Sequence, residues 1–549
     1  MRAWPRAAPA AMLALAAGLW VTGGAGGVTA GAGAATPASA PASSSSWPGY
    51  HQDRAGTGVA PSVTAVTTRT RAWTSPPLDG DIYGEPLVYA QRVYVATEND
   101  TVYALSSATG RLAWSMHLGR AVPAGSLPCG NIAPTVGITG TPVIDQSRGE
   151  IFVVADELVR GRAAHILVGL ATTTGRIEMT RNVDPAGAHP ASLLQRTGLT
   201  LDADRVVFGM GGNFGDCGSY RGRVEAVPET GGSPVVFTAD AAAGESQGAI
   251  WMGGAAPVVD RKGHVWVTVG NGSVTSSSHA YDHSDSVLEL SSTMRLLQFF
   301  APRTWAANNA QDADLSTAPA LLPDGQVIAA GKSRIVYLLN GARLGGIGRQ
   351  EAALGSACAD DIDGGDAMSG MTVYLPCLTG VIAVRATRSP ASLRVLWRAG
   401  NGGGPPIIAA GLVWTISVPN GILLGLNPAT GQVRQQAAIG AEANHFPTPS
   451  VGDGLLLAPS ARHIVAFRAS SSRAATPATP GTAATTASVS PTGQSSPTGG
   501  GGISPGAIAA SVLGGLVVVS GGGWLLWRRR VAGKRRVQLA SRSASRALD

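Results

Sequence analysis

Short hydrophobic runs separated by tight turns dominate the chain, and residues 92–114 show the pattern most clearly. Their sequence, RVYVATENDTVYALSSATGRLAW, contains two β-branched and aromatic runs, VYV and TVYAL. Asn99-Asp100 and Thr109-Gly110 supply turn residues after each of these runs. The pattern predicts three short strands joined by two tight turns. Such a meander is apolar on both faces and cannot bury them alone, so we expect it to recur.

The same pattern recurs along most of the chain. Ala-Thr-Gly stands at 108–110 and 429–431, Thr-Thr-Gly at 173–175 and Glu-Thr-Gly at 229–231. Meanders can be followed over residues 86–114, 142–179, 198–237, 257–298, 319–349, 370–397, 405–434 and 449–467. The last is one strand short, and residues 71–74 (RAWT) could supply that strand from the N-terminal side. The sequence therefore predicts an all-β ring of eight blades. Seven is the alternative, because the unit near residues 340–370 is the least regular.

Composition and charge narrow the class of protein. Gly 74 and Pro 35 among 549 residues, with 44% hydrophobic residues, suit a turn-rich all-β protein. The net charge of +7 comes from the ends. Residues 528–549 hold eight Lys/Arg and one Asp, which is +7, and Arg2 and Arg6 add +2. The rest of the chain therefore sits at −2. We expect no nucleic-acid partner, because no basic surface is left.

Four cysteines, Cys129, Cys217, Cys358 and Cys377, form neither a CxxC pair nor a CxxCH motif. This argues against a zinc site and against a covalently attached c-type haem. For an exported chain, two disulfides are the expected arrangement. Of the three pairings we favour Cys129–Cys217 with Cys358–Cys377, and four unpaired buried thiols are the alternative.

The N-terminus has the pattern of a signal peptide. Arg2 and Arg6 precede an apolar run at residues 7–21, and small residues follow. We therefore assign residues 1–40 to a signal peptide. An uncleaved anchor is the alternative, although the apolar run is short for a bilayer.

The C-terminal part predicts a tether to a membrane. Residues 469–504 are rich in Ser, Thr, Ala, Pro and Gly and predict a flexible linker. Residues 505–527 carry no charge and are about long enough to span a bilayer, with a buried core helix as the alternative. Residues 528–549 are basic, so the positive-inside rule places them in the cytoplasm. The expected protein is a single-pass cell-membrane protein with residues 47–468 outside the cell.

The repeat xxVYVxxxxxxVYALxxxTGxxxW resembles the pyrroloquinoline quinone (PQQ) repeat. That repeat builds the eight-bladed propellers of quinoprotein alcohol dehydrogenases and of related non-enzymatic propellers. The opening WPGYHQDRAGTG at residues 47–58 also resembles the lead-in of this superfamily. The resemblance implies a propeller over residues 47–468, and it does not decide between enzyme and scaffold.

Residues 249–339 look most like the dehydrogenase branch, and this resemblance implies candidate site residues. Trp251 is similar to the tryptophan on which the quinone stacks, and Lys332 to the basic residue that contacts the quinone oxygens. Asn271 is similar to an amide ligand of Ca²⁺. Asp312 or Asp314 lies near the position of the catalytic aspartate, and Asp312 would also approach the metal. Ca²⁺ prefers hard oxygen ligands, so the set is chemically coherent.

The sequence also departs from the dehydrogenase pattern. The glutamate ligand expected near residues 215–218 is missing, and Asp216 could replace it only with a one-residue shift. An adjacent-cysteine pair is absent, and the Trp-Asp sequence is replaced by Trp305-Ala306. Without a haem motif, electrons would need a separate acceptor.

Structural interpretations compete at each candidate position. Trp251 could be a tryptophan between blades, and Asn271-Gly272 is also a common hairpin turn. Asp312 could be a solvated loop carboxylate and Lys332 a surface lysine.

We assign no metal site to two other features of the sequence. The acidic run at residues 360–366 lacks the spacing and final glutamate of an EF-hand, so we interpret it as an acidic turn. The nine histidines form no HxH or HExxH motif, so none is assigned to a metal.

Two functions follow as hypotheses. The first is a cell-surface propeller that binds a protein or small-molecule ligand, or acts as a scaffold, without a cofactor. The displaced aspartate, the missing glutamate and the missing electron relay favour it. The second is a PQQ- and Ca²⁺-dependent dehydrogenase of an alcohol or sugar. Convergence of Trp251, Asn271, Asp312 and Lys332 at one mouth of the ring would favour the second.

Overall fold

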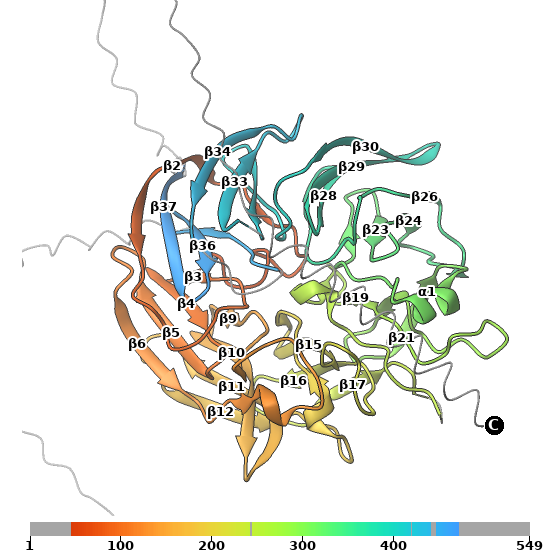
Figure 1. Ribbon diagram of the computed structural model, residues 1–549, viewed down its shortest axis with the longest axis horizontal. Helices are drawn as coiled ribbons and strands as arrows, with labels where there is room; N and C mark the ends of the chain where they lie inside the picture. Colours follow the sequence, from red (N-terminus) through yellow and green to blue (C-terminus); the bar gives the residue numbers. More distant parts are fainter. Residues whose placement is uncertain (1–45, 242–243, 419, 441–445, 472–549) are drawn as a thin grey trace, which may run out of the picture. The chain divides into compact units, whose positions relative to one another are not determined.

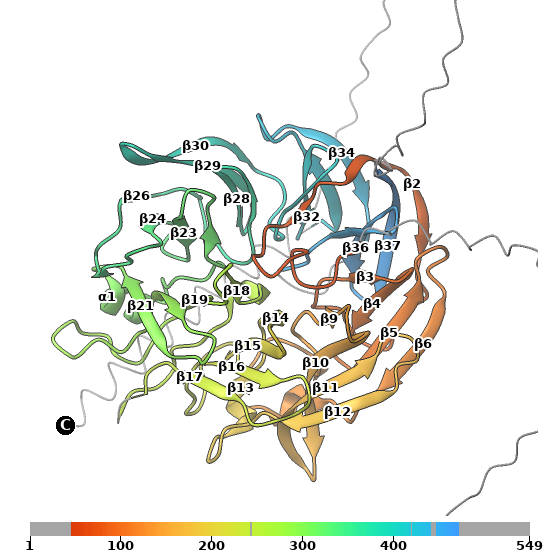
Figure 2. The same ribbon diagram turned by 180° about the vertical axis from the view of Figure 1, so that it is seen from behind.

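The computed structural model describes residues 46–241, 244–418, 420–440 and 446–471. These residues form eight antiparallel blades of four main strands, arranged as a ring (Figure 1). In the first seven blades the first strand lies nearest the centre and the last lies at the rim, as both views show (Figure 2). The predicted count of eight blades is confirmed.

The blades follow the chain in order. The first four are β3–β6 (Leu87–Tyr89, Arg92–Ala96, Thr101–Ser106, Leu112–His117), β9–β12 (Val143–Asp145, Glu150–Val159, Arg162–Ala171, Ile177–Asn182), β14–β17 (Thr200–Asp202, Arg205–Gly212, Arg223–Pro228, Val235–Thr238) and β18–β21 (Val258–Val259, Val265–Val269, Ser286–Leu290, Leu296–Ala301). The next three are β22, β23, β24 and β26 (Ala320–Leu321, Gln326–Ala330, Val336–Asn340, Ala352–Leu354), β27–β30 (Ala367–Ser369, Thr372–Cys377, Gly380–Arg388, Ala391–Ala399) and β31–β34 (Ile407–Ala409, Leu412–Ser417, Ile422–Leu426, Val433–Ala438).

The eighth blade joins the two ends of the described chain. Its inner strands are β35–β37 (Ser450–Gly452, Leu455–Ser460, His463–Ser471), and its outermost strand is β2 (Val63–Thr74). Trp73 of β2 pairs with Ala466 of β37, and Thr74 pairs with Val465. Residues 71–74 therefore supply the missing strand, as the sequence predicts. Because this N-terminal strand pairs with β37 near the C-terminal end of the ring, it joins the two ends and covers the outer edge of β37.

Tryptophan and glycine residues lock neighbouring blades together and explain the repeat. The indoles of Trp73, Trp114 and Trp397 lie in the outermost strands of their blades. A Cβ on the Thr-Gly glycine of the next blade would lie only 2.5 Å from each indole ring, at Gly110, Gly175 and Gly431. Each indole N–H also donates to a carbonyl of that blade, at 2.8 Å to Ser107, 2.9 Å to Thr172 and 2.8 Å to Pro428. The glycines have φ near +70°, a conformation that favours glycine.

The N-terminal lead-in lines the centre of the ring. Main-chain groups of residues 47–58 bond the inner strands of five blades, at Val88, Ile144, Val259, Met368 and Ile408. The lead-in then continues as β1 (Val59–Ala60), which pairs with β31 in parallel. Inner strands would otherwise present unpaired backbone groups to the channel, so the lead-in satisfies them.

A few elements depart from the four-strand plan. β25 (Gly346–Ile347) pairs in parallel with β21 of the preceding blade, which explains the irregular unit near residues 340–370. Short extra strands β7 (Val122–Pro123), β8 (Thr135–Val136) and β13 (Leu193–Leu194) lie in or between blades. The 3₁₀ helices η1 (Ala124–Ser126), η2 (Pro190–Ser192) and η3 (Met252–Gly254) and the α-helix α1 (Trp305–Gln311) lie in the connections.

Both predicted disulfides are present. Cys129 bonds Cys217 and Cys358 bonds Cys377, and no described cysteine is free. The first links the connection after the first blade to a loop of the third blade. The second joins positions 19 residues apart in sequence.

The predicted signal peptide, most of the predicted linker, residues 505–527 and the basic tail lie outside the described residues. β37 extends to Ser471 and so includes the first residues of the range predicted as linker. Across the described part of the chain, no helix combines the length and apolar character needed to cross a bilayer.

Candidate functional site

All predicted site residues lie in loops that open on one face of the ring. In an antiparallel blade, the loop between the second and third strands and the connection leaving the fourth strand emerge on the same side. Asn271 and Lys332 occupy loops of the first kind, after β19 and β23. Trp251, Asp312 and Asp314 occupy connections of the second kind, after β17 and β21. We call this side of the ring the mouth.

Lys332 brings these loops together. Its Nζ lies 2.7 Å from Asp312 Oδ1 and 3.0 Å from Asp314 Oδ1. The same ammonium lies 5.3 Å from the centre of the Trp251 ring, within range of a cation–π contact. The Asp314 side chain is fully buried and the Asp312 side chain is 60% exposed, so Asp312 is the carboxylate of this pair that solvent reaches.

Asn271 completes the contact between the loops. Its backbone N–H donates to Asp314 Oδ2 at 3.1 Å. With its nitrogen turned towards the carboxylates, its side-chain amide donates to Asp314 at 3.1 and 3.2 Å and to Asp312 at 3.3 Å. With its oxygen turned the same way, the amide and both carboxylates present oxygen atoms to one point. The four predicted residues therefore converge at one mouth.

Two glycines allow this close approach. A Cβ on Gly270 would lie 2.5 Å from Asp314 Oδ2, and a Cβ on Gly331 would lie 2.0 Å from the Asp314 carbonyl oxygen. Both glycines directly precede a site residue, Asn271 or Lys332. Gly270 thus leaves room for the buried Asp314 carboxylate, and Gly331 leaves room for the backbone of Asp314.

Trp251 forms a partly exposed wall of the mouth. Its indole N–H donates to the Gly212 carbonyl at 3.0 Å, and its ring lies against Gly211, where a Cβ would be 2.4 Å from Nε1. The indole is therefore held in a fixed orientation and keeps part of its surface accessible. A rigid, partly exposed aromatic ring suits stacking of a planar ligand.

Two further carboxylates belong to the same electrostatic cluster. Asp216 lies in the loop after β15 and interacts with Asn271, Lys332 and Asp312. Tyr220 donates a hydrogen bond of 2.5 Å to Asp216 Oδ1. Asp363, in the connection before β27, interacts with Lys332 and Asp312. If all four carboxylates are ionised, they exceed the single ammonium by three negative charges.

Burial shapes the ionisation of this cluster. Burial raises the pKa of Asp314 to about 6, although Lys332 opposes the shift. Burial raises the pKa of Asp363 to about 6 in the same way. Burial also raises the pKa of Asp216, and the Tyr220 hydrogen bond opposes it. Burial disfavours the Lys332 ammonium, but Asp314 and Asp312 hold the pKa of Lys332 well above its ordinary value.

Sequence reasoning missed Asp363, because it assigned residues 360–366 to an acidic turn. The signal that could have found it is position, since this run precedes an inner strand as Asp312 and Asp314 do. Asp216 was named only as a shifted substitute, and the structure places it beside Asn271. The disulfide at Cys217 follows Asp216 directly, so it ties the loop of Asp216 to the connection that carries Cys129.

A histidine-containing group lies on the opposite face. Asp260, His264 and Glu289 each offer a ligand atom, and these atoms lie within 4.8 Å of one another. His264 Nδ1 is 2.7 Å from Glu289 Oε1, and the Trp266 N–H and the Gln298 amide donate to the carboxylates. The spacing of the histidines in sequence gave no sign of this group.

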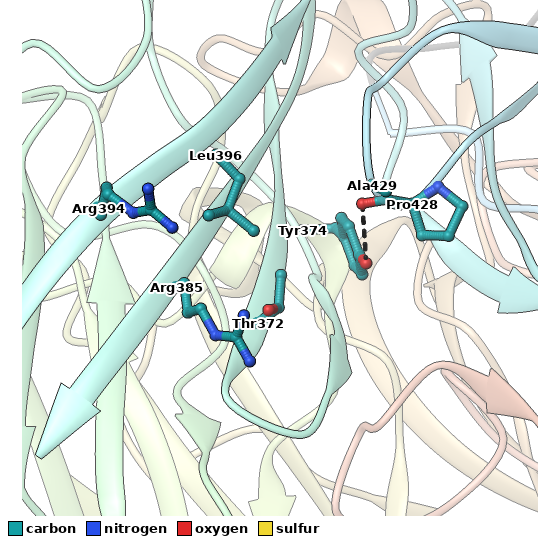
Figure 3. A pocket seen from close by; sticks show the side chains of 7 residues that line it. All are labelled: Thr372, Tyr374, Arg385, Arg394, Leu396, Pro428 and Ala429. Atoms are coloured by element: carbon teal, nitrogen blue, oxygen red, sulfur yellow. Dashed lines mark hydrogen bonds between the residues drawn. The ribbon is translucent and has the colours of Figure 1, made fainter.

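A groove of about 450 Å³ lies away from the mouth, between the blades β27–β30 and β31–β34 (Figure 3). Tyr374 donates to the Pro428 carbonyl at 3.4 Å at one end of it. Arg385 and Arg394 pair directly across β29 and β30 and line the groove. No residue of the predicted site lines it.

The chain is similar to known proteins in part of its sequence and in its fold. Residues 28–266 match a family described as outer membrane protein assembly factor BamB. No curated protein sequence matches the chain significantly. Many solved structures share its fold.

The similar structures include three dehydrogenases. Quinohemoprotein alcohol dehydrogenase ADHIIG from Pseudomonas putida HK5 has 15% identity and a TM-score of 0.58, over 80% of this chain and 82% of its own. The quinohemoprotein alcohol dehydrogenase from Comamonas testosteroni has 14% identity and a TM-score of 0.55, over 77% and 80%. A europium-containing methanol dehydrogenase has 15% identity and a TM-score of 0.55, over 75% and 89%.

These likenesses, at such low identity, show the fold. The chain is an eight-bladed propeller of the PQQ-repeat type, which confirms the superfamily that the sequence indicates. The same fold serves enzymes and scaffolds, so function has to be argued from the mouth.

Proposed function

We propose that the mouth binds a multivalent cation together with PQQ, and that the protein oxidises an alcohol or sugar. The observation that carries the proposal is the convergence of Asn271 and four carboxylates on one ammonium beside the partly exposed Trp251. More carboxylates than ammonium groups at a largely buried site favour a bound cation. The dehydrogenases of similar fold supply the cofactor class, and this chain is only distantly related to them.

The residues present fit both groups. Oxygen atoms of Asn271, Asp314 and Asp216 would hold Ca²⁺, which prefers hard oxygen ligands. The excess of three negative charges also suits a trivalent cation, and one similar structure is described as containing europium. Trp251 would provide the stacking surface, and the Lys332 ammonium lies where it can pair with oxygens at the edge of a stacked ring.

Each residue would have a distinct task in the reaction. When bound, PQQ supplies the two-electron acceptor that oxidises an alcohol to a carbonyl compound. Asp312 is exposed in the mouth and can accept the proton of the substrate hydroxyl. Asp314 is buried and holds Lys332 and Asn271 in position. Lys332 remains charged and stabilises negative charge beside it.

We further propose that this reaction takes place outside the cell. The predicted signal peptide would direct export, and residues 505–527 with the basic tail would hold the propeller on the outer side of the cell membrane. Two disulfides support an oxidising compartment. The chain holds no haem motif, so electrons would pass to a separate acceptor.

Dye-linked oxidation of alcohols and sugars by the full-length protein, loaded with PQQ and either Ca²⁺ or Eu³⁺, tests the proposal. Loss of a proton acceptor typically costs 10²–10⁴-fold, so Asp312→Asn should reduce kcat by at least about 100-fold. Asp324→Asn, on a turn of the opposite face, is the matched control. Absence of oxidation by a protein that binds neither PQQ nor a cation would reject the proposal.

A binding role without cofactor is the second candidate, and the groove in Figure 3 favours it. Arg385 and Arg394 carry like charges directly opposite each other, and an anionic partner would relieve their repulsion. A glutamate-rich peptide labelled with a fluorophore is the probe. The binding role predicts an affinity that falls with salt and disappears in Arg385→Gln/Arg394→Gln, and equal binding by this variant would contradict it.

A further inference from the structure

Two buried carboxylates next to the mouth have oxygen atoms that accept no hydrogen bond. Asp240 follows β17 and Asp282 lies between β19 and β20, and they are 0% and 1% exposed. Both oxygens of Asp240 and Oδ2 of Asp282 receive no hydrogen bond within the described parts of the chain. Burying a carboxylate without hydrogen bonds is costly. Although Arg221 lowers the pKa of Asp240, no described side chain donates a hydrogen bond to these oxygens, so they favour a bound counterpart.

The unpaired oxygens face one point beside Gly272. A Cβ on Gly272 would lie 2.5 Å from Asp282 Oδ2 and 2.8 Å from Asp240 Oδ2. The two oxygens are therefore at most 5.3 Å apart, the sum of these distances. Ca²⁺ binds oxygen at about 2.3–2.6 Å, so a single ion can bridge a pair at this separation.

Local contacts fix the direction of both carboxylates. Ser284 donates to Asp282 Oδ1 from its amide at 3.1 Å and from its hydroxyl at 2.5 Å, which leaves Oδ2 turned to Gly272. Asp240 has φ of +50°, a conformation that is uncommon for a residue with a side chain. Its amide donates to the Asp282 carbonyl at 3.2 Å, so the two loops are already joined at this point.

We propose that Asp240 and Asp282 form a second cation site, for a hard divalent ion such as Ca²⁺, that is distinct from the cluster around Asn271. All available donors are oxygens, as such an ion prefers. Asp240 lies in the connection that carries Trp251, and Asp282 lies in the loop that carries Asn271. The ion therefore ties the stacking wall of the mouth to its amide ligand. The site needs no quinone, so it stands even if the proposed oxidation fails.

A shared proton is the competing occupant of this carboxylate pair. Burial and the neighbouring Asp282 raise the pKa of Asp240 to about 9. Glu245 raises it as well, whereas Arg221 lowers it. A cation would replace that proton, and counting the bound ions distinguishes the two occupants. Only the cation site loses a bound ion when a carboxylate becomes an amide.

The test is the number of Ca²⁺ ions bound by the full-length protein without PQQ, after chelator treatment and equilibrium dialysis. Asp240→Asn and Asp282→Asn should each bind one equivalent fewer than the wild type. Asn271→Ala should keep that equivalent, which separates this site from the cluster around Asn271. Asp324→Asn, on the opposite face, is the control for loss of a carboxylate.

Thermal unfolding of the same samples shows that the variants are folded. Saturating Ca²⁺ should raise the unfolding midpoint of the wild type more than that of Asp240→Asn, while both unfold cooperatively. Equal numbers of bound Ca²⁺ in the wild type and both amide variants would overturn the proposal. So would an absence of Ca²⁺ binding by the folded wild type, which would leave the shared proton as the occupant.

Discussion

The contact between Trp73 and Gly110 closes the ring, and the loss of stability on breaking it can be predicted. Trp73 lies in β2, the N-terminal strand of the eighth blade, and its indole packs on Gly110 of the first blade and bonds the Ser107 carbonyl. Trp73 is 9% exposed, so truncation to alanine leaves a cavity and should cost about 3–5 kcal/mol of unfolding free energy. The change would weaken the contact between the two ends of the ring.

Gly110 tests the same contact from the other side. Its φ is +69°, so alanine pays about 1–2 kcal/mol for the left-handed conformation. An alanine Cβ would also lie 2.5 Å from the Trp73 ring, and overpacking adds about 1–3 kcal/mol. Gly110→Ala should therefore cost about 2–5 kcal/mol in the wild type but only about 1–2 kcal/mol when Trp73 is already alanine.

Urea unfolding followed by circular dichroism measures the four free energies of this double-mutant cycle. Gly370→Ala is the control, because Gly370 has φ of +57° with nothing within 4 Å of an added Cβ. The control should show the conformational cost alone, in either background. If Gly110→Ala costs the same with and without Trp73, the two groups are not coupled, and the account of ring closure is refuted.

Three further predictions concern single contacts. Lys332→Gln leaves the buried Asp314 carboxylate without its ammonium partner, so it should lower the free energy of unfolding by about 3–5 kcal/mol. Adding Asp314→Asn removes the unpaired charge and should restore much of this stability. A denaturant titration measures both changes. His165 lies between two carboxylates; burial opposes its charge, but they raise the pKa of His165 to about 10. Its stabilisation is complete below pH 6.5 and is lost as pH rises towards 10, so the stability of His165→Gln should fall less steeply there than that of the wild type. The Cys358–Cys377 bond closes a short loop, so Cys358→Ser/Cys377→Ser should cost about 3 kcal/mol, whereas an unchanged unfolding midpoint would contradict the chain-entropy argument.

The blades could be predicted from sequence because their causes are local. Two-residue periodicity and turn residues define the strands, as in β4, β5 and β6. The Thr-Gly and Trp positions recur because an indole of one blade needs a glycine in the next. The partner strand for β37 could also be found, because residues 71–74 share the repeat pattern.

The path of the lead-in could not be predicted, because its bonds are to the backbone of inner strands. Backbone partners leave no pattern in side chains, so residues 47–58 carry no periodic signal of the five blades they contact. The parallel pairing of β25 with β21 was hidden for the same reason.

The mouth was predictable only in part. Resemblance to dehydrogenases pointed to Trp251, Asn271, Asp312 and Lys332, and the structure brings them together. Asp363 comes from a different blade, and only the ring geometry places it near Lys332. The roles of all these residues in binding and chemistry remain predictions.

Binding of PQQ with a cation to the folded protein tests the central claim most directly. Thermal unfolding of the full-length protein in Ca²⁺, with PQQ added at about 100 times its dissociation constant, should show about 2.7 kcal/mol of stability beyond that with Ca²⁺ alone. Asn271→Ala should abolish the gain, and Asn340→Ala, at the end of β24 on the opposite face, should keep it. A folded wild-type protein whose unfolding midpoint is unchanged by PQQ with Ca²⁺ or Eu³⁺ would contradict the claim.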